Sequence, residues 1–244
     1  MRRGLAWVVA LASLVACGGD GQRSVSESRP VTATEAGILA DVLHRNLESG
    51  GAHFEATAMI DGAAVSLRGV VSWTAHAGSA ALQVGSIPPY EVRWTADAVF
   101  RAVPGLAERM AAAGHPGVRW VVLPADPQGR RLDVVIGLLV GLASTTPDNP
   151  VNMQQQPDVE WLRSGTVDGD EVDVFRKGRI ELSIARSDAM LRRLLAQLAF
   201  TDGPLQVDVS DFGSQPFAIP PSDEIIDGRQ IPDVYAELTQ LSVI

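Results

Sequence analysis

The spacing of hydrophobic residues follows a helical period up to residue 50 and a strand period directly after it. Five aliphatic residues recur at intervals of three and four and predict one amphipathic helix: Ile38, Leu39, Val42, Leu43 and Leu47. Thr32 and Glu35 have the spacing of a capping box at the start of this helix, and Gly50-Gly51 would stop it.

From residue 52 to residue 103, apolar and polar residues alternate, as on strands that are buried on one face only. The first two runs are joined by Asp61-Gly62, a pair typical of two-residue hairpin turns. Short strands that follow one another closely predict an antiparallel meander with one face toward water.

The middle of the chain changes character twice. A short helix is predicted at 105–113 and one more strand at 118–122. The run at 131–143 is apolar on all sides and about three and a half turns long. We expect this helix to be buried, since it is too short to cross a bilayer. Residues 144–157 are polar and contain prolines, which predicts a loop.

The last third returns to strand-like runs, which turn signals separate: 159–167, 172–175, 180–185, 191–200 and 205–210. Residues 191–200 also fit a helix by propensity, but the close turn signals on both sides favour a strand. A last short helix is predicted at 233–241. Because no linker interrupts residues 32–244, we expect a single domain there.

The N-terminus has the pattern of a secretory leader. Two arginines, an apolar run from Leu5 to Val15 and a small residue precede Cys17, the single cysteine of the chain. The run Leu14–Cys17 resembles the lipobox of bacterial lipoproteins, which implies a diacylglyceryl group on Cys17. The alternative is an ordinary signal peptide with an incidental cysteine. We expect a signal peptide at 1–16, a flexible tether at 17–31 and a lipid anchor in the outer face of the cell membrane.

Charge and cysteine content narrow the classes of partner. The formal net charge is −9, and removal of the leader with its two arginines leaves −11. Nucleic-acid binding rests on Lys and Arg contacts to phosphate, so no nucleic-acid partner is expected. A single cysteine allows no internal disulfide, so the core alone must stabilise the fold.

No group of residues typical of an enzyme or a metal site stands out. The four histidines are scattered without paired spacing, and we expect no catalysis, metal or cofactor. The acidic run at 168–173 lacks the register of a calcium loop and is interpreted as a hairpin turn at Asp168-Gly169. Asp211-Phe212-Gly213 is interpreted as a strand end followed by a glycine turn, and 153–156 as a solvated connector.

The order of these elements resembles the lipoproteins of the LppX/LprG type from mycobacteria and relatives. Residues 205–225 (LQVDVSDFGSQPFAIPPSDEI) are similar to that family's last strand, its Ser-Asp-aromatic-Gly step and its Pro-Pro exit. The valine strand at 172–174 after an Asp-Gly turn is similar to a hairpin of the family, whereas 179–200 departs from its pattern and leaves that register open. The resemblance covers about residues 34–227. It implies the LolA-like fold: an α+β domain with a strongly curved antiparallel sheet, an incomplete barrel, wrapped around a few helices.

The apolar helix at 131–143 is the candidate functional element. One interpretation is plain core packing, with Gly137 and Gly141 allowing a close approach to the sheet. The other is an apolar cavity larger than about 500 Å³ between helix and sheet. The residues expected to line it are Ile60, Val71, Trp73, Leu82, Val92, Trp94, Trp120, Val135, Leu138, Leu139 and Leu142.

Together with the anchor, the resemblance implies a lipoprotein that takes up the acyl chains of an envelope lipid or lipoglycan and carries or presents it. Each CH₂ group buried in such a cavity would contribute roughly 0.8 kcal/mol. Its expected partners are that lipid, the membrane and a membrane transporter. The alternative is an envelope interaction lipoprotein with a closed core, which binds a protein through an exposed apolar patch. The volume of the cavity separates the two hypotheses.

Overall fold

The computed structural model describes residues 28–233, 235 and 236. The folded part begins with a two-residue strand, β1 (Arg29–Pro30), and helix α1 (Ala33–Ser49). The Thr32 hydroxyl accepts a hydrogen bond from the Glu35 N–H at 3.3 Å, and the Glu35 carboxylate accepts one from the Thr32 N–H at 2.8 Å. Gly50 ends α1 with a φ of 90°, which glycine adopts without strain. The predicted helix and its capping box are confirmed.

The predicted tether at 17–31 ends too late in the chain, because residues 29–31 belong to the folded part. Arg29 pairs with Trp161 in a short antiparallel ladder, and Val31 is 3% exposed within the core. The Arg29 guanidinium lies 4.5 Å from the centre of the Trp161 ring, and this cation–π contact holds the strand in place although both of its residues are exposed. Residues 17–27 lie outside the described residues.

The first half of the sheet is the predicted meander. Its strands are β2 (Gly51–Ile60), β3 (Ala63–Ser72), β4 (Ala77–Val84), β5 (Tyr90–Trp94), β6 (Ala98–Arg101) and β7 (Trp120–Pro124), and helix α2 (Leu106–Ala112) lies between β6 and β7. Asp61 and Gly62 join β2 to β3 with φ values of 49° and 76°, the positive values that a type I′ turn requires.

Two helices follow, where one helix and a loop are predicted. Helix α3 (Arg131–Val140) ends before the predicted limit at residue 143. The predicted loop at 144–157 contains helix α4 (Pro150–Gln155), whose N-cap Asn149 accepts a hydrogen bond from the Val151 N–H at 2.9 Å. Met153 of the predicted solvated connector is 3% exposed. The prediction is wrong here because six residues are too few to show a helical period, and tertiary burial stabilises the helix.

The second half of the sheet is another meander, made of β8 (Val159–Val167), β9 (Asp170–Lys177), β10 (Ile180–Ala185), β11 (Leu191–Ala196) and β12 (Leu205–Ser210). The strand predicted at 191–200 is confirmed as far as Ala196, since β11 pairs with both β10 and β12. The β10–β11 register, left open by the sequence, contains a bulge between Ser183 and Ile184. Asp168 and Gly169, with φ of 49° and 95°, form the predicted hairpin turn.

After β12 the chain turns at Asp211-Phe212-Gly213, as predicted, and runs to η1 (Ser222–Glu224), β13 (Ile225–Asp227) and η2 (Gly228–Gln230). The described strands form one sheet of 13 strands in the order β1-β8-β9-β10-β11-β12-β2-β3-β4-β5-β6-β7-β13. Neighbouring strands are antiparallel except β13, which is parallel to β7. The helix predicted at 233–241 lies mostly outside the described residues. The α+β class, with an unclosed and mostly antiparallel sheet and a few helices, is confirmed.

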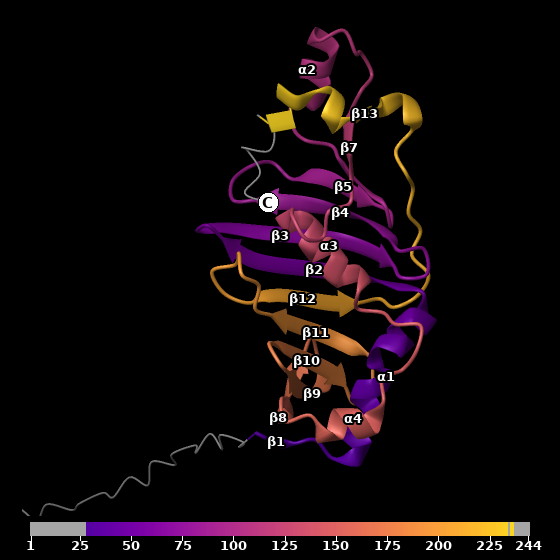
Figure 1. Ribbon diagram of the computed structural model, residues 1–244, viewed down its shortest axis with the longest axis vertical. Coiled ribbons are helices and arrows are strands. Elements are labelled where there is room, and N and C mark those ends of the chain that lie inside the picture. Colours follow the sequence, from indigo (N-terminus) through magenta and orange to yellow (C-terminus); the bar gives the residue numbers. More distant parts are fainter. Residues whose placement is uncertain (1–27, 234, 237–244) are drawn as a thin grey trace, which may run out of the picture.

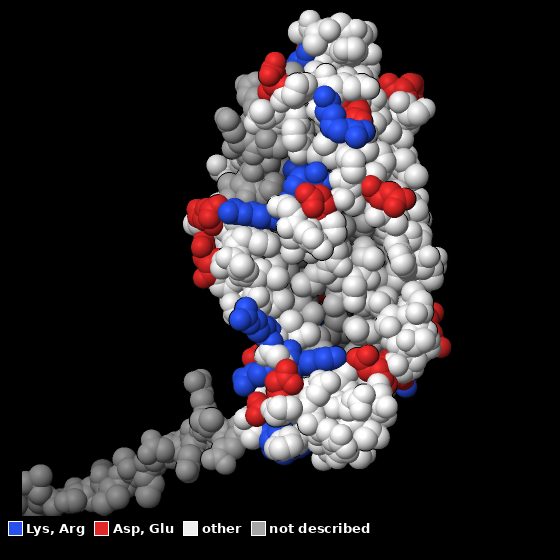
Figure 2. Space-filling model, viewed as in Figure 1, with Lys and Arg blue, Asp and Glu red and all other residues white. Residues whose placement is uncertain are grey.

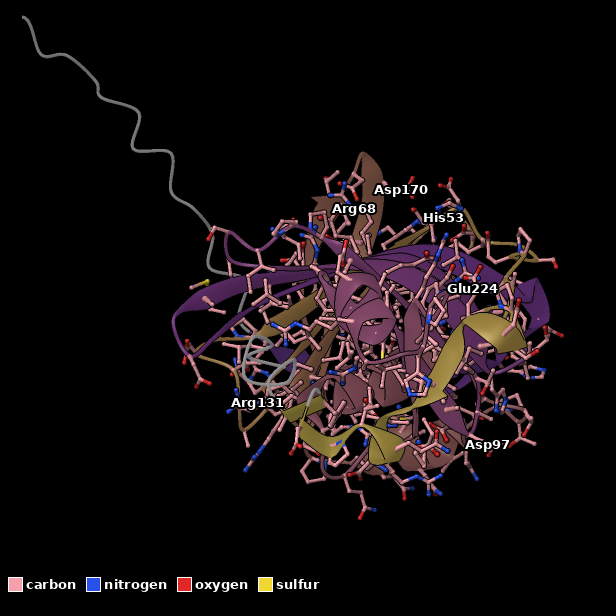
Figure 3. All side chains as sticks on the ribbon, turned by 90° about the horizontal axis from the view of Figure 1, so that it is seen from above. His53, Arg68, Asp97, Arg131, Asp170 and Glu224 are labelled. Carbon is pink, nitrogen blue, oxygen red and sulfur yellow. The ribbon has the colours of Figure 1, made fainter. Side chains whose placement is uncertain are left out.

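Helix α3 crosses one face of the sheet in front of β2–β5, and α1 and α4 lie beside the strands of the second meander (Figure 1). The main hydrophobic cluster takes side chains from α1, α3 and α4, from β2–β6 and from β8–β12. Seen from above, His53 and Arg68 lie on the outer face of the sheet, and Arg131 of α3 lies on the other side, where the helix is (Figure 3). One helix layer and one sheet therefore enclose a common core.

Candidate functional site

The structure brings together all but one of the eleven predicted cavity residues. Six of them lie on the strands or directly after β3, and all six are buried in the main cluster: Ile60, Val71, Trp73, Leu82, Val92 and Trp94. From α3 and the residues after it, Val135, Leu139 and Leu142 are buried in the same cluster, and Leu138 packs against it half-buried. The alternation of apolar residues along the meander thus identifies the inner face of the sheet.

Trp120 is the exception and lies on the other face. Arg101 of β6 pairs with Val92 on one side and Val121 on the other, so these three side chains share the inner face. Trp120 precedes Val121 and therefore points outward, where the Arg93 guanidinium covers its ring at 4.8 Å. The prediction is wrong because both faces of β7 are covered, and alternation does not identify the inner face of such a strand.

Helix α3 is apolar on its outer side as well, but that side is not buried as predicted. Val134 and Leu138 are half-buried and Gly137 and Gly141 are exposed. A Cβ atom at Gly137 would meet Pro127 and not the sheet, so the glycines do not allow a close approach to the strands. The middle of this face of the molecule is largely uncharged (Figure 2).

Two hydrogen bonds hold the C-terminal end of α3 to the body of the protein. The indole N–H of Trp73 donates to the Leu139 carbonyl at 3.0 Å, and the Asn46 amide donates to the Leu142 carbonyl at 2.7 Å. Asn46 and Leu139 are 0% exposed and Trp73 is 1% exposed, so these bonds lie in a dry interior. Loss of either bond would leave a buried polar group unpaired, which would lower the stability of the fold.

The space between α3 and the sheet is filled by side chains. What remains is an apolar void of about 20 Å³ under α3, lined among others by Ala56, Leu82 and Val135. This is room for about one water-sized molecule, whereas ligand pockets occupy about 300–1,000 Å³. Trp94 packs edge-on to Phe54, with ring centres 6.1 Å apart. The expected cavity of more than about 500 Å³ is therefore not present between these elements.

A buried charged group lies at the N-terminal end of α3, and sequence reasoning missed it. Asp133 is 2% exposed and Arg101 is 4% exposed. The Asp133 Oδ2 accepts hydrogen bonds from Arg130 Nε at 3.1 Å and from the Asp126 N–H at 2.8 Å. Arg101 Nη2 lies 3.6 Å from Asp133 Oδ1. The available signal was a single acid within the apolar run at 131–143.

The acidic run at 168–173 forms ion pairs and hairpin structure. The Asp173 carboxylate accepts hydrogen bonds from Arg186 Nη2 at 2.7 Å and from the Trp161 indole at 3.1 Å. The hydrogen bond from Arg186 lowers the pKa of Asp173, although partial burial opposes this shift. Within the described part of the chain, no three His, Cys, Asp or Glu side chains are grouped as a metal site would require.

Cys17 and the leader lie outside the described residues, so the anchor stays a prediction. None of the helices in the described ranges is long and apolar enough to span a membrane.

No family model and no curated protein matches the chain. It is similar to the solved structure of an uncharacterized conserved protein from Thermus thermophilus, with 12% identity, a TM-score of 0.42 and coverage of 80% of this chain and 98% of that chain. It is also similar to MucB in the Pseudomonas aeruginosa MucA/MucB complex, with 14% identity, a TM-score of 0.32 and coverage of 79% of this chain and 59% of that chain. A third similar structure is a DUF1329 family protein from Desulfovibrio piger, with 9% identity, a TM-score of 0.29 and coverage of 79% of this chain and 96% of that chain. The resemblance to LppX/LprG lipoproteins stays a prediction.

Proposed function

We propose that this protein is a lipid-anchored interaction lipoprotein of the cell envelope that binds a protein partner. The observation that supports this proposal over lipid carriage is the filled interior, with a void of about 20 Å³ under α3. A protein that binds its partner at the outer surface needs a stable fold but no internal cavity. The leader and Cys17 supply the expected anchor.

The segment between β12 and η1 offers a surface for such a partner. Phe217 and Ile219 on this segment are 36% and 55% exposed, and they rank among the few large hydrophobic side chains exposed in the described residues. Arg93 Nη1 donates to the carbonyl of Ala218, between them, at 2.9 Å and fixes the backbone there. Neighbouring exposed apolar side chains on a fixed backbone suit a protein interface better than single scattered ones do.

The test is site-specific photo-crosslinking in cells with the full chain. A photoreactive residue replaces Ile219, and the matched control replaces Val151 on α4, which is 56% exposed. We expect one defined protein adduct at position 219 that is absent at 151 and lost in the Phe217→Ser variant. Equal labelling at both positions, or none at 219, would refute the proposed surface.

Lipid carriage is the second candidate, and the mostly apolar side chains around the void favour it. Ala56, Ala58 and Leu205 line the void, and of its lining residues only Thr201 carries a polar side chain. A variant that begins after Cys17 lacks both the apolar leader and the anchor, so any lipid extracted from it would be bound by the folded residues. We expect none in stoichiometric amount by mass spectrometry. About one acyl lipid per chain would replace the proposed function with lipid carriage.

A further inference from the structure

One end of the molecule combines the start of the folded chain with a surface that carries little charge. Directly after helix α4, the carbonyl of Gln156 accepts a hydrogen bond from the Val159 N–H at 3.2 Å. The next residue, Glu160, pairs with Pro30 of β1. Helix α4 and β1 therefore lie at the same end of the sheet, next to the first described residue, Ser28 (Figure 1).

The surface around α4 is exposed and almost uncharged. Of residues 144–158, only Asp148 and Asp158 have charged side chains, and the Asp148 carboxylate pairs with Lys177 at 3.2 Å. Val151 of α4 is 56% exposed, the largest value among the exposed large hydrophobic side chains of the described residues. In Figure 2, the end of the molecule over α4 is largely without charged groups. Hydroxyl and amide side chains and prolines make up most of the rest of this surface.

The position of Cys17 in the sequence identifies what covers this surface. Cys17 precedes Ser28 by eleven residues, a stretch that spans at most about 36–40 Å when fully extended. The diacylglyceryl group proposed for Cys17 would therefore hold this end of the sheet beside the bilayer. A charged side chain that approaches lipid loses its hydration at a high cost in free energy, whereas an uncharged surface loses little. In a chain of net charge −9, the surface around α4 thus suits contact with lipid.

We infer that the α4 surface, which comprises the exposed residues of 145–157, lies against the lipid headgroups of the membrane that holds the Cys17 anchor. This inference rests on the anchor of the proposed function. Helix α4 has six residues and one exposed large hydrophobic side chain, too little to bind a bilayer without the anchor. The anchor supplies the affinity, and the α4 surface sets the orientation of the folded part.

This orientation holds the proposed protein interface away from the lipid. Arg93 of β5 contacts Ala218, between Phe217 and Ile219. Strand β5 is the eighth strand from β8 in the sheet, so about 38 Å of sheet separate the two at about 4.8 Å per strand. Phe217 and Ile219 would face the space outside the bilayer, where a protein partner can reach them.

The test measures whether position 151 is shielded by lipid in the anchored protein. The full chain with Val151→Cys takes a nitroxide label at that position alone, because Cys17, its only other cysteine, is acylated. In phosphatidylcholine vesicles, we expect collisions with a water-soluble nickel chelate to be at least about 3-fold rarer than for Ile219→Cys, a matched control at a side chain that is 55% exposed. In a chain that begins after Cys17, the two positions should be equally accessible.

A charge on the α4 surface should separate it from the lipid. The label is moved to Gln154, which is exposed and lies three residues further along the same side of α4. Val151→Asp should then raise the accessibility of the label to the nickel chelate at least about 2-fold. Met59→Asp, at an exposed side chain of β2, is the control and should leave it unchanged.

Two kinds of failure are distinguishable. Equal accessibility at positions 151 and 219 in the acylated chain, or a protein adduct at 151 in the crosslinking assay, would overturn this inference and leave the interface at Phe217 and Ile219 standing. A mature chain without an acyl group on Cys17 by mass spectrometry would refute the anchor itself, and with it both this inference and the lipid-anchored part of the proposed function.

Discussion

The buried ion pair between α3 and β6 gives the sharpest stability prediction. Replacing Asp133 with Asn removes the negative charge that Arg101 and Arg130 share. Arg101 is 4% exposed and cannot reach water, so it would be left as an uncompensated buried charge. Breaking a buried pair in this way costs about 3–5 kcal/mol. In a chain of 244 residues, each kcal/mol corresponds to about 2–4 °C, so the midpoint of thermal unfolding should fall by about 6–20 °C.

The assay is thermal unfolding of the full chain followed by circular dichroism. The double variant Asp133→Leu with Arg101→Met removes both charges, and it should recover most of the loss because apolar residues of similar size often replace a buried pair without cost. Asp97→Asn is the control at an exposed carboxylate and should shift the midpoint little. A fall of less than about 2 °C for Asp133→Asn, or a double variant no more stable than the single one, would refute the reasoning.

Three further variants test the core and the N-terminal cap. Leu139→Ala, at a position that is 0% exposed, should lower the free energy of unfolding by about 2–5 kcal/mol in urea titrations. Thr32→Ala should lower it by about 1 kcal/mol, measured in the same way, because the α1 capping box is lost. The Arg29 hydrogen bond lowers the pKa of Glu35 from 4.5 to about 2. This carboxylate therefore stabilises the fold above pH 4.5, and the contribution is lost as the pH falls from 4.5 toward 2. In Glu35→Gln that part of the acid unfolding curve should flatten, and an unchanged curve would contradict the assignment.

The strands and turns of both meanders could be predicted because their signals are local. Asp61-Gly62 and Asp168-Gly169 form tight turns with positive φ at both positions, which few residue pairs tolerate. The Thr32–Glu35 capping box likewise fixes the start of α1 from residues three apart. These features need no knowledge of the rest of the fold.

Features that depend on contacts between distant residues could not be predicted in the same way. Helix α4 is stabilised by Met153, whose burial the polar sequence around it does not indicate. Trp120 and Val121 are both buried, so β7 carries no one-sided pattern, and the sequence does not show that Trp120 lies on the outer face. The pairing of Arg101 with Asp133 joins residues from β6 and α3 that no motif connects.

The volume of empty space in the interior could not be predicted from the amino-acid sequence, because a lipid cavity and a solid core require the same apolar side chains. The deciding contact here is the hydrogen bond from the Trp73 indole to the Leu139 carbonyl, since it spans from the residue after β3 to α3 at 3.0 Å. A tryptophan that touches the helix backbone occupies the space in which an acyl chain would lie. Uptake of a lipid would have to break this bond and separate Leu139 from the sheet, whereas protein binding at the outer surface leaves both in place. The filled interior therefore separates the two functions more sharply than the identity of its residues does.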